Sequence, residues 1–328
     1  MARYHELIAN PGQGQERFER RIALLRAIEQ ATGRPIVVYA ANFNHPNIPN
    51  SIDNTDVTPF SELTRTVPGK ALDILLHSPG GLAEATERIV SLLRARFDSV
   101  RFVVLHSAFS AATMLAMSGD QLVLDDTSAL GPIDPQIVYR DPQTGQSIAV
   151  PTQAVLDGFR KAKDEIKKNP DALGVYLPLL NKLDLHLFEI CENADKLSKT
   201  LVRSWLKSYM FKGDARAGEK ATRITKYLST HRDRLSHGRP ITIDTLKNHL
   251  KLHVVDLREA AELRDMFSQL WAEVEWFVDN TDTAKFFENA YGVAFRRRFQ
   301  IQQVVNLQLG PVPPQQPAQP APPNPEPG

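Results

Sequence analysis

The stretch that most constrains the fold spans residues 72–136, where apolar runs alternate with turns that contain glycine or serine. Its first apolar run, residues 72–76, leads into the turn Ser78-Pro79-Gly80-Gly81, after which a helical apolar pattern follows. A second apolar run, residues 101–105, is followed by Ser110 and another short helical segment. This order predicts a parallel βαβ unit, because a crossover helix must join neighbouring parallel strands.

The two turns have residues that suit acyl transfer. Both follow the carboxyl ends of predicted strands, where ligands bind in open α/β sheets. Gly80 and Gly81 can adopt backbone angles closed to other residues, so they can aim bare N–H groups at one point. Such groups form an oxyanion hole, which acyl transfer needs together with a nucleophile, here Ser110. Each feature alone also has an ordinary interpretation, since this glycine turn is common and a serine before a helix is often an N-cap.

Four motifs in this order resemble the Clp/crotonase superfamily, and most closely the serine dehydrogenase proteinase family, which is related to signal peptide peptidase A. The resemblance covers about residues 36–255 and implies an α/β fold, a Clp/crotonase-like ββα superhelix with a parallel sheet. The motifs are Ile74-Leu75-Leu76-His77-Ser78-Pro79-Gly80-Gly81, Ser110-Ala111-Ala112-Thr113, Leu130-Gly131-Pro132-Ile133-Asp134-Pro135-Gln136 and Ser236-His237-Gly238-Arg239-Pro240-Ile241.

The resemblance also implies a function and a site. It implies a serine peptidase with Ser110 as the nucleophile and Gly80 and Gly81 at the oxyanion hole. It further implies a peptide or protein substrate and a homo-oligomer. One departure is that relatives often have a basic residue before the serine, where this chain has Phe109. The substrate groove would be lined by Gly131, Pro132 and Asp134.

The base that would accept the serine proton is left open by the sequence. The histidine of Clp peptidases would fall within residues 131–136, where Asp134 is the only titratable residue. The lysine of signal peptide peptidase A, which must be desolvated to be neutral, would fall in the charged helix after Pro151. His237 is the third option, because residues 233–256 resemble the Clp segment that supplies the triad acid, and an imidazole titrates near neutral pH. We expect His237 first and, among Lys161, Lys163, Lys167 and Lys168, Lys163 second.

Length and pattern predict four parts: an N-terminal helix (1–35), the protease domain (36–258), a helical C-terminal extension (259–309) and a disordered proline-rich tail (310–328). The extension is predicted as helical because residues 259–299 have a helical pattern, which is also rich in aromatic residues. The single cysteine, Cys191, excludes an internal disulfide and is expected in the core.

Charge and hydropathy exclude several classes of protein. The formal net charge of +1 gives no reason to expect a nucleic-acid partner. No apolar run has the length of a signal peptide or a membrane span, so we expect a cytoplasmic protein without a transmembrane segment. The chain has no Walker-type phosphate loop, and we expect no cofactor and no metal.

Two other functions compete with the peptidase. A crotonase-like enzyme would use the same glycine donors to stabilise the enolate of an acyl-CoA thioester. A catalytically impaired interaction protein would keep the fold without hydrolysis, and Phe109 and the lack of an obvious base favour it.

Overall fold

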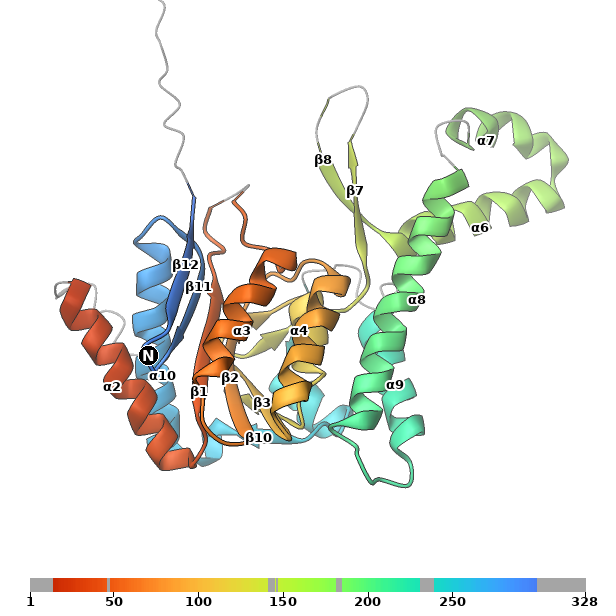
Figure 1. Ribbon diagram of the computed structural model, residues 1–328. Helices are drawn as coiled ribbons and strands as arrows, with labels where there is room; N and C mark the ends of the chain where they lie inside the picture. The colour runs from red at the N-terminus through yellow and green to blue at the C-terminus, as the bar shows by residue number, and fades with distance from the viewer. Residues whose placement is uncertain are drawn as a thin grey trace, which may run out of the picture.

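The computed structural model describes residues 14–45, 48–140, 145, 147–180, 185–230 and 239–299. Its centre is a seven-stranded sheet of order β10-β5-β3-β2-β1-β11-β12 (Figure 1). The first five strands in this order are parallel and the last two are antiparallel, which confirms the expected mostly parallel α/β sheet. Their bounds are β1 Ile36–Ala41, β2 Ala71–His77, β3 Ser99–Val104, β5 Gln121–Leu124, β10 Val254–Asp256, β11 Thr283–Asn289 and β12 Ala294–Arg298.

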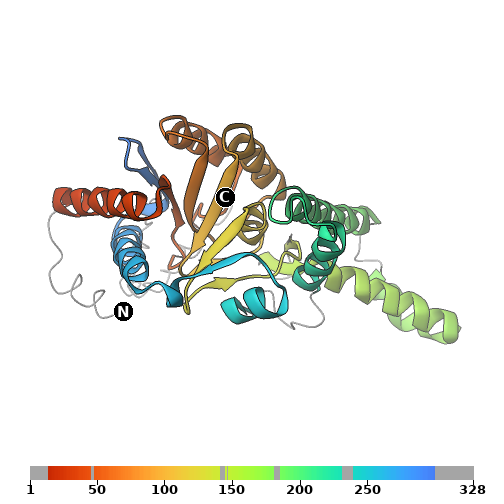
Figure 2. The same ribbon diagram turned by 90° about the horizontal axis from the view of Figure 1, so that it is seen from below.

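Helices cover both faces of this sheet, which explains why its strands are continuous apolar runs. The 3-10 turn η1 (Asn54–Asp56) leads into α3 (Val57–Arg65), which covers one face with α4 (Ala83–Arg96) and α5 (Ala111–Ala116). Two further helices, α2 (Gly14–Thr32) and α10 (Ala261–Asp279), cover the other. Figure 2 shows these two, red and blue, lying together beside the sheet. Every residue of β1 is buried, as burial on both faces requires.

A second, three-stranded sheet stands at the carboxyl ends of the main strands. It is formed by β4 (Ser107–Ala108), β6 (Ala129–Leu130) and β9 (Ile241–Thr242). Strand β4 pairs with β6, β6 pairs with β9, and a bridge joins Ala108 to Ser78. The small sheet therefore brings together segments that are far apart in the sequence and that include three of the four family motifs.

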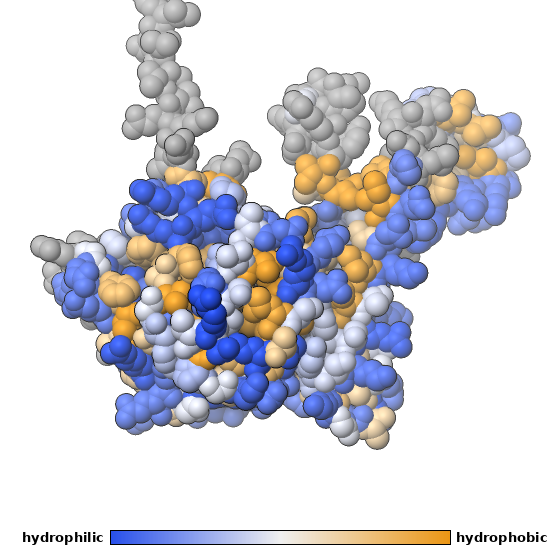
Figure 3. Space-filling view, viewed as in Figure 1, coloured by the Kyte–Doolittle hydropathy of each residue, from blue (hydrophilic) through white to orange (hydrophobic). Residues whose placement is uncertain are grey.

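An arm leaves the body after β6 (Figure 1). It begins with the hairpin of β7 (Gln136–Arg140) and β8 (Ser147–Pro151), and most of the hairpin tip lies outside the described residues. Apolar surface shows at the foot of the hairpin and along the arm (Figure 3), where Val138, Val175 and Ile190 are exposed. The helices of this region are α6 (Thr152–Lys168), η2 (Pro170–Ala172), α7 (Leu173–Leu180), α8 (Leu185–Ser208) and α9 (Ala217–Ser229).

The chain returns to the main sheet through β9, a π-helical turn η3 (Thr245–His249), β10 and a 3-10 turn η4 (Leu257–Glu259). Cys191 is buried in α8, as expected. Within the described ranges, no helix is both long enough and apolar enough to cross a membrane.

The expectation of a C-terminal extension that is helical to residue 299 is wrong beyond residue 279. Helix α10 is present, but residues 283–298 form the hairpin of β11 and β12. Strand β11 is buried at every position, with Phe286 facing the α2 and α10 side and Phe287 the α3 side. A run that is apolar on both faces has no period that separates a strand from a helix. Because β11 pairs with β1, this segment is part of the central sheet.

Candidate active site

The turn after β2 has a backbone that only glycine tolerates well. Gly80 has φ 102° and Gly81 has φ 154°, both in the region that side chains disfavour. A Cβ atom on Gly80 would lie 2.7 Å from Ser110 Cβ and 2.5 Å from the Phe109 carbonyl oxygen. A Cβ atom on Gly81 would lie 2.2 Å from the Ile52 carbonyl oxygen. The glycine turn is therefore in direct contact with the serine turn, as the candidate site requires.

Ser110 sits on a strained turn between β4 and α5. Its φ is 51° and its ψ is −120°, and among the described residues only Lys251 is another non-glycine with positive φ. Although Ser110 holds the N-cap position of α5, its side chain makes no capping hydrogen bond. Strain of this kind is found at functional sites, including the sharp turns that present a nucleophilic serine. The N-cap interpretation of Ser110 thus fails, and the half-buried hydroxyl is left available.

The N–H groups around Ser110 differ in what they contact. The Gly80 N–H donates to Ser78 Oγ at 3.2 Å, so this donor is already used. The N–H groups of Gly81 and Ala111 have no acceptor among the described residues. Ala111 is the first residue of α5, where helix geometry leaves the N–H unpaired. A Cβ atom on Gly80 would lie 2.9 Å from Ala111 N, so the start of α5 lies against the glycine turn.

Ala111 was not among the predicted donors, although its N–H has no acceptor among the described residues. The signal was available, because the first N–H groups of a helix have no partner within the helix. The N–H groups left open beside Ser110 are those of Gly81 and Ala111, and an oxyanion hole at Gly80 and Gly81 stays a prediction.

The third motif packs against the serine turn. The Gly131 N–H donates to the Ala108 carbonyl oxygen at 3.0 Å, and a Cβ atom on Gly131 would lie 2.7 Å from the Phe109 ring. Gly131 is therefore beside the serine turn. The Thr113 hydroxyl strengthens this contact, because it donates to the Gly131 carbonyl oxygen at 3.0 Å. Pro132 and Asp134 are buried in this chain, and their place in a substrate groove stays a prediction.

Of the two predicted bases, His237 lies outside the described residues. The residues that flank its segment are described, and both sides contact the third motif. The Ile133 N–H donates to the Leu228 oxygen at 3.0 Å, and Ile241 pairs with Leu130.

Lys163, the second predicted base, is exposed on α6. It lies eleven residues beyond Thr152, or roughly 16 Å further along the helix axis, on the arm that leaves the body (Figure 1). Thr152 itself is tied to the third motif, since its N–H donates to the Pro135 oxygen at 2.9 Å. In this chain Lys163 therefore lacks the desolvation that a neutral lysine base needs.

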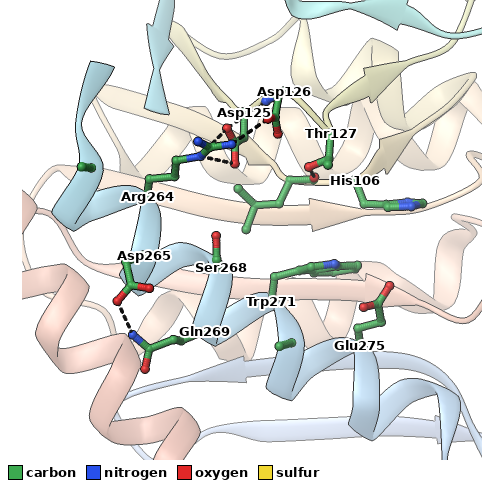
Figure 4. Close-up of a pocket in the computed structure, with 13 residues that line it drawn as sticks. His106, Asp125, Asp126, Thr127, Arg264, Asp265, Ser268, Gln269, Trp271 and Glu275 are labelled. Atoms are coloured by element: carbon green, nitrogen blue, oxygen red, sulfur yellow. Dashed lines mark hydrogen bonds and ion pairs between the residues drawn. The ribbon is translucent and has the colours of Figure 1, made fainter. Parts of the chain in front are cut away.

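A cavity of about 750 Å³ lies at the same edge of the sheet, on the α10 side (Figure 4). Its wall includes the pair of Arg264 with Asp125 at 2.8 Å, and the ring of Trp271, which stacks on His106 at 6.2 Å. Beneath it, Trp271 also contacts His77 at 4.6 Å between ring centroids.

Burial shifts two titratable groups in this region. Burial, with the nearby His106, lowers the pKa of His77 to about 3. Burial, with the nearby Asp279 carboxylate, raises the pKa of Glu275 to about 7. Across the described ranges, no three His, Cys, Asp or Glu side chains are grouped so that they could hold a metal ion.

Ser107, three residues before Ser110, also belongs to this α10 side. Its Oγ lies 2.8 Å from His106 Nδ1. Its backbone is fully used, because its N–H donates to His77 Nδ1 at 3.3 Å and its oxygen accepts from the Ser78 N–H at 3.1 Å.

Comparisons with known proteins agree with the motifs. A family profile described as ClpP-like SDH-type serine proteinase matches residues 52–273. Uncharacterized protein MJ1495 of Methanocaldococcus jannaschii is 25% identical over 77% of this chain and 78% of its own length. Uncharacterized protein MJ0137 of the same organism is 28% identical over a match that covers 54% of this chain and 51% of that protein.

Among solved structures, a mutant of the 1510-N membrane-bound stomatin-specific protease, in complex with a substrate peptide, is similar at 18% identity and a TM-score of 0.39. The similarity covers 66% of this chain and 75% of that chain. The family resemblance carried by the four motifs is confirmed by the profile, which spans about two thirds of the sequence. The chain thus belongs to the ClpP-like SDH-type serine proteinase family.

Proposed function

We propose that the protein is a serine peptidase in which Ser110 is the nucleophile and the N–H groups of Gly81 and Ala111 form the oxyanion hole. The observation that supports this best is the contact between the glycine turn and a strained serine whose hydroxyl makes no cap. Family membership supports the reaction class.

The proposed reaction follows from this arrangement. Ser110 Oγ forms a bond to the carbonyl carbon of an extended peptide while a base takes the hydroxyl proton. The carbonyl oxygen becomes an oxyanion between the two N–H groups. The C–N bond then breaks, the base returns its proton to the leaving amine, and water hydrolyses the ester. Removing one such preorganised donor typically costs about 3–4 kcal/mol of transition-state stabilisation.

We propose His237 as the base, with Lys163 as the second candidate. The flanks of the His237 segment contact residues 130–133, which adjoin the serine turn. The exposure of Lys163 makes it the weaker candidate. The homo-oligomer that the family resemblance implies is kept as part of this proposal, and the exposed apolar residues of the arm support it.

The test is a Ser110→Ala variant, assayed with peptides and with a fluorophosphonate probe. We expect both labelling and cleavage to fall by at least about 1,000-fold, because the nucleophile is lost. Equal labelling of this variant and the wild type would reject Ser110. No labelling of a folded wild type that forms stable partner complexes would favour the interaction protein, and measurable acyl-CoA binding would favour the crotonase-like enzyme.

The base is tested in the same assay by pH. We expect His237→Ala to lose the rise of kcat/KM around pH 6–7 that an imidazole base produces. Lys163→Ala is the matched comparison and should keep that rise. The opposite pattern would assign the base to Lys163.

A further inference from the structure

The glycine turn is held in place by the backbone of Ile52. The Ile52 N–H donates to the Gly80 oxygen at 2.7 Å, and the Ile52 oxygen accepts from the Leu82 N–H at 2.9 Å. These two bonds fix the peptide units on both sides of Gly81, so they set the direction of its N–H. Whatever holds Ile52 therefore also holds this donor.

The loop that contains Ile52 is held by one buried ammonium group. Lys285 Nζ donates to the Ser51 oxygen at 2.7 Å and to Asp53 Oδ2 at 3.0 Å. It also contacts Asp56 Oδ1 at 2.8 Å and Oδ2 at 2.9 Å. The side chain of Lys285 is 0% exposed and that of Asp56 is 1% exposed. A buried charge with this many partners fixes the loop, because moving the loop would leave the ammonium group buried without its partners, which is energetically costly.

A second route joins the same group to the turn. Asp56 Oδ2 accepts from the Tyr39 hydroxyl at 3.3 Å and from the Asp53 N–H at 3.0 Å. Tyr39 also interacts with the side chain of Ser78. Ser78 Oγ in turn accepts the Gly80 N–H. The glycine turn is thus linked to Asp56 and Lys285 mainly through Ile52 and, less directly, through Tyr39 and Ser78.

Lys285 comes from an unexpected part of the chain. It lies on β11, opposite Ala41 at the end of β1, and outside the family match at residues 52–273. Figure 1 shows β11 beside β1 in the central sheet.

We propose that Lys285 is a positioning residue for the oxyanion hole, acting through the loop of residues 51–56, so that the C-terminal hairpin completes the active site. The inference rests on the proposed function, because it assigns a role in that reaction. Lys285 does not touch the substrate; it fixes the backbone that presents the Gly81 N–H.

The test compares Lys285→Met with Arg21→Met. Arg21, on α2, forms a buried ion pair with Glu288 at 2.8 Å. Glu288 is on the same strand as Lys285, but its side chain is on the opposite face of the sheet, away from the glycine turn. Both changes leave a buried carboxylate without its cation, so both should lower the melting temperature. We expect Lys285→Met to lower kcat for peptide cleavage by at least about tenfold with KM within about twofold, since an oxyanion donor acts on the transition state. Arg21→Met should keep kcat within about twofold.

A second variant covers the case in which Lys285→Met does not fold. The double variant Lys285→Met/Asp56→Asn leaves no buried charge unpaired, and the new amide oxygen can still accept from the Tyr39 hydroxyl. The hydrogen bond from residue 285 to the Ser51 oxygen is lost. This double variant should fold and show the same loss of kcat. Wild-type kcat in this folded double variant, or equal losses in Lys285→Met and Arg21→Met, would overturn the proposal.

Hydrogen exchange separates this inference from the proposed function. The amides of Ile52 and Leu82 should exchange faster in the Lys285 variants and not in Arg21→Met, whether or not the protein cleaves peptides. If the Lys285 variants exchange faster but the wild type shows no Ser110-dependent labelling, the peptidase is rejected and the role of Lys285 in fixing the loop is kept. Unchanged exchange would reject the positioning role on its own.

Discussion

Two serines three residues apart, Ser107 and Ser110, show what makes a candidate nucleophile in this fold. Ser107 has a histidine partner, with Oγ 2.8 Å from His106 Nδ1, yet its N–H and carbonyl are both bonded within the sheet region. Ser110 has no such partner among the described residues, but it has a strained backbone and lies beside two unpaired N–H groups. Under the proposed function, the oxyanion donors, more than a nearby imidazole, would define the site.

The physical reason is that the donors must be fixed before the reaction starts. A base can be supplied by one side chain with several rotamers, whereas aimed backbone N–H groups need a whole loop in one conformation. The structure places that loop on the α3 and α5 side and collects His77, His106 and Glu275 on the α10 side. The proposed reaction site and this group of titratable residues therefore lie on opposite faces of the sheet, at the same edge.

The strongest way to break this comparison is Gly80→Ala. The added methyl would lie 2.7 Å from Ser110 Cβ and 2.5 Å from a backbone oxygen, so the serine turn must move. We expect kcat to fall by more than about 100-fold, because a displacement near 1 Å at the reacting atoms has such an effect. Peptide cleavage at saturating substrate measures it.

Gly69→Ala is the matched control for Gly80→Ala. Gly69 also has positive φ, at 77°, but a Cβ atom there meets nothing within 4 Å. It should cost about 1 kcal/mol of stability and leave kcat within about twofold. If Gly80→Ala behaves like Gly69→Ala, the contact between the two turns has no catalytic meaning.

The sequence was enough to predict the features that lie close together in the chain. The apolar runs and the residues between them predicted the parallel strands, the glycine turn and the position of Ser110 before a helix. These depend on local patterns of about 4–18 residues, which is the range over which hydrophobic periodicity is informative. The meeting of Gly80 with Ser110 followed from the rule that parallel strands end at one edge.

What the sequence did not predict depends on contacts between distant residues. The β11–β12 hairpin was predicted as helix, because an aromatic run buried on both faces has no strand period. The bond of Lys285 to Asp56 joins residues 229 positions apart, and no spacing in the chain indicates it. The use of the Gly80 N–H by Ser78, which points to Ala111 as the second donor, is likewise a matter of backbone angles that composition does not encode.

A second prediction sharpens the comparison from the α10 side through Glu275. Its pKa is raised to about 7 by burial and by the Asp279 carboxylate, so the folded state holds the proton more tightly than the unfolded chain does. The stability due to this proton is complete below about pH 4.5 and is lost as the pH rises through about 7. Glu275→Gln cannot lose it, so the variant should be more stable than wild type at pH 8 by about 1–2 kcal/mol and not at pH 4.5.

Denaturant unfolding of wild type and Glu275→Gln at several pH values measures this effect. Glu262→Gln, an exposed change on the same helix, is the control and should leave the pH dependence as in wild type. Peptide cleavage by Glu275→Gln should keep its pH profile. A changed profile would show that the two sides of the sheet edge are not separate in function.

The smallest expected effect belongs to Ser107→Ala, and it tests the comparison directly. The change removes the hydroxyl next to His106 and leaves the backbone bonds to His77 and Ser78 in place. Because Ser107, unlike Ser110, has both its N–H and its carbonyl oxygen bonded and is not on a turn with positive φ, we expect fluorophosphonate labelling and kcat to stay within about threefold of wild type, with a stability loss near 1 kcal/mol for one hydrogen bond. Mass spectrometry of the labelled wild type locates the probe independently. A probe on Ser107, or loss of labelling in Ser107→Ala with labelling kept in Ser110→Ala, would mean that the histidine partner, and not the oxyanion turn, selects the nucleophile.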